Sequence, residues 1–271
     1  MKRFSVFFAL AAALASLAGC ETMDKTWTAT KQTTQGYYKE YLNTDPTIDY
    51  EARDWTSSEG KLADLFAPVD KPLYRLSIAL NRQDAFPEDA WVEALLAANP
   101  WLSGLAVATL GGEVVLQRPE TALKPLNLAP ALAHGQALAD RRLRAYVDMT
   151  PLGPEIYLAT GMFRGNELVG AITAHFDIRN VIEASPEPGA LVVATPEELI
   201  WAGSDDAAAR AVSAQPWAEI LAERSLGRFV AEGREYIWLC RFLGDHKIIY
   251  ATASVEDDTG EESGFSFFGL F

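Results

Sequence analysis

The chain has 271 residues, of which 49% are hydrophobic, and it carries a formal net charge of -14 at pH 7. This acidity argues against a nucleic-acid partner and against adhesion to anionic lipid through basic patches. A chain of this size and composition can bury one large apolar core or two smaller ones.

The first twenty residues have the order of an export signal. Lys2 and Arg3 precede an uncharged apolar run, residues 4–17, which is shorter than the ~20 residues that a membrane-spanning helix needs. Leu17-Ala18-Gly19-Cys20 follows and resembles the lipobox of bacterial lipoproteins, in which the cysteine is lipidated and the leader is removed. The resemblance implies a lipoprotein signal peptide over residues 1–19 and a membrane anchor on Cys20. The alternative is an ordinary secretory signal with an incidental cysteine.

A lipid anchor has consequences for the rest of the chain. With Cys20 lipidated, Cys240 is the remaining thiol, so no intramolecular disulfide can form. The protein is expected in the cell envelope, facing the periplasm or the exterior. Glu21, which follows the cysteine, favours the outer over the inner membrane by resemblance to the enterobacterial sorting rule.

Residues 20–59 are predicted to form the lipidated N-terminus and a tether. This segment is polar but rich in aromatic residues, which either pack back on the body or dock a partner: Tyr37, Tyr38, Tyr41, Tyr50 and Trp55.

A helical region is predicted from Gly60 to Asn99, with Pro87 in the first turn of its second part. Apolar residues then recur at helical spacing before Pro100, and we interpret them as core. After Pro100 the period changes. Residues 104–117 predict two strands around a Gly111-Gly112 turn, and residues 123–144 are predicted to be partly helical.

Strands are predicted over residues 144–149, 155–163 and 167–178, which gives a first module over 60–185. A Pro-rich linker follows, and a similar order of elements returns: a strand pair at 190–203, a helical stretch at 205–224, and strands at 227–231, 234–243 and 246–254. This is a second, smaller module over 186–255, followed by an acidic and apolar tail over 256–271. The predicted fold is α+β, with a long N-terminal helical region followed by two PAS-like antiparallel sheets.

This order of elements resembles the double Cache domain, an extracytoplasmic ligand-binding sensor of bacterial chemoreceptors and kinases. Three segments carry the likeness: Asn99–Leu105 before the Gly-Gly turn, Gly165–Ile182, and the paired strands of residues 227–254. The resemblance implies a sensor that binds a small molecule.

Side-chain alternation along the strands locates a candidate site. His175 and Asp177 share one face of their strand, Arg144 and Tyr146 share a face of theirs, and Tyr157 lies on the strand between. A guanidinium can hold a carboxylate, a carboxylate can hold an ammonium, and aromatic rings can form walls around a zwitterion or a small carboxylate.

In amino-acid-binding double Cache proteins, an Arg with aromatics holds the ligand carboxylate, and an Asp that ends the last distal strand holds the amine. Asp177 matches that Asp. Arg144 with Tyr146 matches the other element in part, because the expected Trp-Tyr pair is absent, and Tyr157 is a candidate for the later aromatic. The alternatives are a helix cap at Asp177, a surface salt bridge at Arg144 and a sheet-surface histidine at His175.

Motifs for catalysis are missing, and the three histidines have no metal-ligand spacing. We therefore expect no enzyme, no catalytic or metal residues and no cofactor. The predicted function is a membrane-anchored lipoprotein that binds an amino acid, amine or carboxylate and passes the ligand or its binding state to a protein partner. The alternative is an envelope assembly or scaffold lipoprotein that acts through protein contacts.

Overall fold

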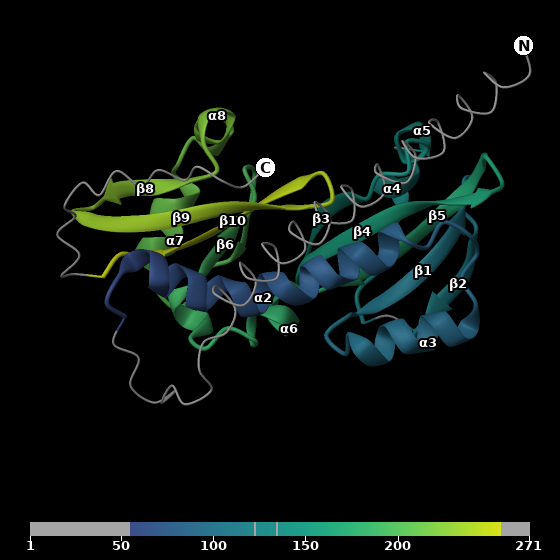
Figure 1. Cartoon of the computed structure of the whole chain (residues 1–271), viewed down its shortest axis with the longest axis horizontal. Helices are drawn as coiled ribbons and strands as arrows, with labels where there is room; N and C mark the ends of the chain where they lie inside the picture. The colour runs from purple at the N-terminus through teal and green to yellow at the C-terminus, as the bar shows by residue number, and fades with distance from the viewer. Residues whose placement is uncertain (1–54, 122, 134, 256–271) are drawn as a thin grey trace, which may run out of the picture. The chain divides into compact units, whose positions relative to one another are not determined.

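A long helix, α2 (Ser58–Asn81), opens the part of the chain that the computed structural model describes, residues 55–121, 123–133 and 135–255. The Ser57 hydroxyl caps it by accepting a hydrogen bond from the Gly60 amide at 3.1 Å. Its buried apolar residues recur every three or four positions: Leu62, Leu65, Val69, Leu73, Leu76 and Leu80. This stripe packs against strands of both sheets described below (Figure 1), so a single helix face contributes to both cores.

Sheet A has five antiparallel strands in the order β2-β1-β5-β4-β3. The strands are β1 (Gly104–Thr109), β2 (Val114–Arg118), β3 (Arg144–Thr150), β4 (Gly153–Arg164) and β5 (Glu167–Phe176). Helix α3 (Asp89–Ala98) precedes the sheet, and the short helices α4 (Ala129–Ala133) and α5 (Gly135–Leu138) lie in the connection from β2 to β3. The α4 and α5 segments contact sheet A and cover one of its faces (Figure 1).

Sheet B repeats this plan, with the order β7-β6-β10-β9-β8. Its strands are β6 (Val192–Ala194), β7 (Leu199–Trp201), β8 (Leu226–Ala231), β9 (Arg234–Leu243) and β10 (His246–Ala253). Helices α7 (Asp206–Ser213) and α8 (Trp217–Glu223) occupy the connection that α4 and α5 occupy in sheet A. Along the chain, α6 (Ile178–Ile182) and a 3-10 turn, Pro188–Ala190, connect the last strand of sheet A to the first strand of sheet B. The predicted fold class, α+β with a helical lead-in and two PAS-like antiparallel sheets, is confirmed.

Two local details differ from the sequence-based expectation. The helical region predicted over 60–99 is interrupted between α2 and α3, and Pro87 lies just before the capping residue Glu88 instead of in the first turn. The strand predicted to reach Ile178 ends at Phe176, because the Asp177 side chain caps α6. The predicted domain boundaries stay a prediction, and the segments 1–19 and 256–271 lie outside the described residues, as does most of 20–59.

Because the α2 stripe is fully buried, we expect Leu76→Ala to lower the free energy of unfolding by about 2–5 kcal/mol. Arg75→Ala, at the neighbouring exposed position, is the control and should change it by less than about 0.5 kcal/mol. Chemical denaturation followed by circular dichroism measures both. Equal stability of the two variants would contradict the assigned packing of α2.

Candidate functional site

A row of aromatic rings crosses the face of sheet A that α4 and α5 cover. Strand register places Tyr146 opposite Tyr157, Tyr157 opposite His175, and His175 opposite Gly104. The tyrosine rings stack with centroids 4.7 Å apart, and the Tyr157 and His175 rings stack at 5.3 Å. At the end of the row a Cβ on Gly104 would lie 2.6 Å from the Arg118 carbonyl oxygen and 2.9 Å from His175 Nε2, so only glycine fits there.

Charged groups lie beside this row, at the end of the sheet where β4 begins and β5 ends. Glu155 is fully buried, and its Oε1 lies 2.7 Å from His175 Nδ1. Its Oε2 pairs with the Lys124 ammonium at 3.0 Å, and the same ammonium pairs with Asp177 Oδ2 at 2.5 Å. Because an ionised carboxylate only accepts hydrogen bonds, His175 Nδ1 carries the proton in this contact.

Asp177 has two roles in the structure. Its Oδ1 accepts a hydrogen bond from the Arg179 amide at 2.9 Å, which caps α6, and its carboxylate also pairs with the Arg179 side chain. The side chain of Asp177 is nevertheless almost buried, with 8% exposed. The helix cap that the sequence offered as the alternative is therefore present, together with the pairing to Lys124.

The segment from Lys124 to Leu128 lies over the aromatic row. The Tyr146 hydroxyl donates to the Asn127 carbonyl at 2.8 Å, the Tyr157 hydroxyl donates to the Pro125 carbonyl at 3.4 Å, and the Asn127 amide donates to the Tyr157 oxygen at 3.2 Å. Burial raises the pKa of both tyrosines, so both hydroxyls keep their protons. Polar contacts from the sheet thus hold a segment that has no regular secondary structure of its own.

The carboxylates are kept ionised by their partners. Burial alone would raise the pKa of Glu155, but hydrogen bonds from His175, Ser103 and Lys124 outweigh burial and lower the pKa below its ordinary value. The pKa of Asp177 is likewise lowered, because hydrogen bonds from Arg179 and Lys124 outweigh its burial. The cluster is therefore a set of buried, paired charges.

A lowered pKa means that the unfolded chain binds protons more readily than the folded chain. The stabilisation from Glu155 and Asp177 is therefore present above their ordinary pKa values and is lost as the pH falls from about 4.5 through the lowered values. We expect the double variant Glu155→Gln, Asp177→Asn to lose stability less steeply over this acid range than the wild type. Urea unfolding between pH 5 and pH 2.5 measures the slope, with the exposed Glu93→Gln as control. A slope equal to that of wild type would show that these two carboxylates do not couple to folding.

Arg144 lies one row beyond Tyr146 on the same face of β3 and is separated from Asp177. Its guanidinium pairs with Asp140 at 2.5 Å and with Asp245, on the β9–β10 turn, at 3.2 Å. The cross-strand register places Thr173 of β5 in the same row as Arg144. About 13 Å of extended chain separates Thr173 from Asp177. The structure thus places Tyr146, Tyr157 and His175 in one stacked row, with Asp177 beside it. The cation that contacts Asp177 from outside its own helix is Lys124, and not Arg144.

Sequence reasoning missed Glu155, Lys124 and Arg179. Glu155 lies on the same face of its strand as Tyr157. A charged residue on that inward-facing side could have indicated a buried ion pair. Lys124 lies in a Pro-flanked segment whose fold follows no pattern, so nothing in the sequence indicated its partner. Cys20, the predicted lipidation site, lies outside the described residues.

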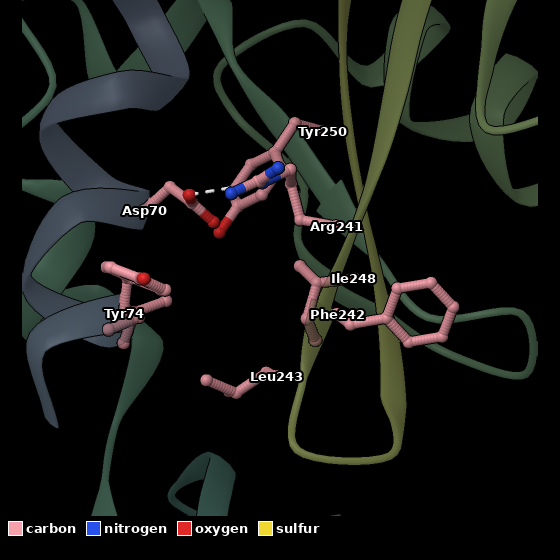
Figure 2. A pocket seen from close by; sticks show the side chains of 8 residues that line it. Asp70, Tyr74, Arg241, Phe242, Leu243, Ile248 and Tyr250 are labelled. Carbon is pink, nitrogen blue, oxygen red and sulfur yellow. Dashed lines mark hydrogen bonds and ion pairs between the residues drawn. The ribbon is translucent and has the colours of Figure 1, made fainter. Parts of the chain in front are cut away.

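A small pocket lies elsewhere, between α2 and the strands β9 and β10. Figure 2 shows the Asp70 carboxylate facing Arg241, with which it pairs at 3.2 Å, and the Tyr250 hydroxyl nearby. Burial raises the pKa of Asp70 although Arg241 opposes the shift, and burial raises that of Tyr250 as well. The Tyr250 hydroxyl is buried without a hydrogen-bond partner among the described residues. The lining of this pocket is mainly apolar, with Leu73, Leu243 and Ile248 beside the polar groups.

Among residues 55–121, 123–133 and 135–255, no group of three or more His, Cys, Asp or Glu side chains is arranged to hold a metal ion. Of the helices in the same part of the chain, none combines the length and the apolar character needed to cross a membrane.

No protein-family model matches the chain, and no curated protein matches it by sequence. Solved structures do match. The extracellular domain of vpHK1S-Z8, a histidine-kinase candidate, has a TM-score of 0.50 at 10% identity, over 73% of this chain and 90% of that one. The fold is double Cache-like.

Two other similar structures are a ligand-binding domain of a chemoreceptor and an extracellular ligand-binding receptor. The chemoreceptor CtaA domain of Pseudomonas fluorescens, solved with L-leucine, has a TM-score of 0.46 at 14% identity, over 74% of this chain and 92% of that one. An extracellular ligand-binding receptor from Desulfohalobium retbaense has a TM-score of 0.46 at 13% identity, over 72% of this chain. The match spans 38% of the Desulfohalobium chain.

Proposed function

We propose that this protein is a lipid-anchored lipoprotein of the cell envelope that binds a small polar ligand and passes its binding state to a protein partner. The ligand class is an amino acid, amine or carboxylate. The observation that carries the proposal is the covered face of sheet A, where two buried carboxylates, a lysine and a histidine lie beside stacked tyrosines. Burying charges costs free energy that apolar residues would not cost, and such groups gather at functional sites.

The aromatic row and the charge cluster have separate parts in this proposal. Tyr146 and Tyr157 supply flat walls, and the Asp177 carboxylate supplies the counter-charge for an amine. Arg144, which is held by Asp140 and Asp245, is assigned no contact with that amine. A thermal-shift screen of the mature protein against amino acids, amines and carboxylic acids tests the proposal. A screen without any saturable shift would oppose it.

One observation favours the alternative, an assembly or scaffold lipoprotein that acts through protein contacts. Lys124 already neutralises Asp177, and the tyrosine hydroxyls are already bonded to the chain itself. Polar groups that already have partners within the protein do not need a ligand to pair with. Affinity capture from envelope extracts together with a negative ligand screen would support this function.

The charge of Asp177 should matter for binding. We expect Asp177→Asn to weaken the affinity for a ligand found in the screen by about 30-fold or more, because a desolvated charged hydrogen bond is lost. Asn keeps the capping ability at this position. Isothermal titration calorimetry measures the affinity.

Asp205→Asn is the matched control, because Asp205 also caps a helix, α7, and also pairs with an arginine, Arg234. It lies in the second module and should leave the affinity unchanged. Equal affinities of wild type and Asp177→Asn would remove Asp177 from the site.

The anchor is tested separately. Cys20→Ser should release the protein from the membrane fraction or leave it as an unprocessed precursor, because no thiol is left for the lipid. Cys240→Ser is the control and should fractionate like wild type, since Cys240 is a buried residue of β9. Immunoblots of membrane and soluble fractions measure both variants. Normal maturation and membrane attachment of Cys20→Ser would refute lipidation at this residue.

A further inference from the structure

The Lys124 ammonium occupies a cage of four oxygen atoms. Its Nζ lies 2.8 Å from the Pro154 carbonyl oxygen, 3.3 Å from that of Gly153, 2.5 Å from Asp177 Oδ2 and 3.0 Å from Glu155 Oε2. The lysine side chain is 10% exposed, and both carboxylate side chains are less exposed than that. An ammonium has three N–H donors, and they bond the Gly153 and Pro154 carbonyls and Asp177 Oδ2, while Glu155 Oε2 adds a second opposite charge at ion-pair distance without a hydrogen bond.

The cage and its occupant belong to different kinds of structure. The two carbonyl oxygens belong to the first residues of β4, the Glu155 carboxylate on the same strand is held by His175, and the Asp177 carboxylate caps α6. The lysine comes from the connection between β2 and α4, whose described residues 119–121 and 123–128 have no regular secondary structure and where Leu123 is 97% exposed. The frame is therefore rigid, and the occupant is tethered to it by a loop.

If Lys124 left the cage, Glu155 and Asp177 would be buried without the cation between them, which is strongly unfavourable. Asp177 then keeps Arg179 and Glu155 keeps His175, and a new cation in the cage restores the missing charge between them. N···O distances of 2.5 to 3.3 Å suit N–H donors and leave no space for methyl groups on the nitrogen. A primary ammonium meets this requirement, and a quaternary one does not.

We propose that these four oxygens form a site for a primary ammonium group, that Lys124 fills it in the unliganded protein, and that an external amine competes with Lys124 for it. The inference rests on the proposed function, because it assigns the amine of the ligand to this cage. Competition couples binding to the covering segment: when an amine enters, Lys124 leaves, and the segment from Lys124 to Leu128 loses its charged attachment to the sheet.

The test uses the full chain in mild detergent, with methylammonium chloride as the probe and tetramethylammonium chloride at equal ionic strength as the control. We expect Lys124→Ala to melt below wild type and to regain about 3–6 °C at a methylammonium concentration ten times the dissociation constant. The half-effect concentration should be at least tenfold lower than in wild type, because the competing lysine is gone. Tetramethylammonium should produce no saturable shift.

Two variants control for other effects of losing a lysine. Lys124→Met keeps an aliphatic stem in the cage, so it should be destabilised and should not respond to methylammonium. Lys61→Ala removes a partly buried lysine whose ammonium donates to the Ala253 carbonyl, and it too should not respond. If Lys124→Ala does not fold alone, the yield of folded protein on refolding with methylammonium replaces the melting temperature as the measurement.

The inference is overturned if Lys124→Ala shows neither a saturable shift nor a refolding gain with methylammonium, or if tetramethylammonium is equally effective. This result differs from a failure of the proposed function. A ligand found for wild type, together with an unresponsive Lys124→Ala, removes the cage and leaves the function standing. A responsive Lys124→Ala with a negative wild-type screen keeps the cage and removes the small-ligand function.

Discussion

The apolar stripe of α2 is the constraint on which the rest of the described structure depends. Leucines spaced three or four residues apart pack against β4 in one sheet and against β9 and β10 in the other. The same core cluster includes residues of the shorter helices α3 and α6. The two sheets are therefore positioned by one shared helix face and not by direct pairing of their strands, which leaves the opposite face of sheet A free to bury polar groups.

The amount of fold that the sequence predicts depends on how regular the local pattern is. Strands β4 and β5 are largely buried, mostly apolar runs on either side of an Arg-Gly-Asn turn, and α7 and α8 are separated by Pro216, so all four elements follow from apolar runs and turn residues. Strand ends were harder to place. Alternation continues through Asp177 in the sequence, but the side chain of that residue bonds the Arg179 amide, and this local contact ends the strand.

The candidate site was predictable in its aromatic part and not in its charges. Tyr146, Tyr157 and His175 lie on strands, where the pleat fixes which face a side chain takes, so their alignment across the sheet follows from register. Lys124 reaches Glu155 and Asp177 from a loop, and a loop contact depends on where the whole chain passes. Arg144 shows the converse case: its strand position was predictable, but its partner Asp245 lies about a hundred residues away, in the turn of the other sheet.

The junction of the two sheets combines the polar contact between Arg144 and Asp245 with the apolar packing of α2. Asp245 also accepts a hydrogen bond from the Ala145 amide, and the neighbouring Gly244, with φ of 63°, brings the β9–β10 turn against the backbone of residues 143–145. Both carboxylates that hold Arg144 are more than one-third exposed, so dissolved ions weaken this polar side of the junction. Salts such as sulfate, which are excluded from the protein surface, strengthen apolar packing. They therefore stabilise the α2 side of the junction while they weaken its polar side. The ionic composition of the surrounding fluid thus shifts the balance between the polar and the apolar contacts of this junction, independently of any bound molecule.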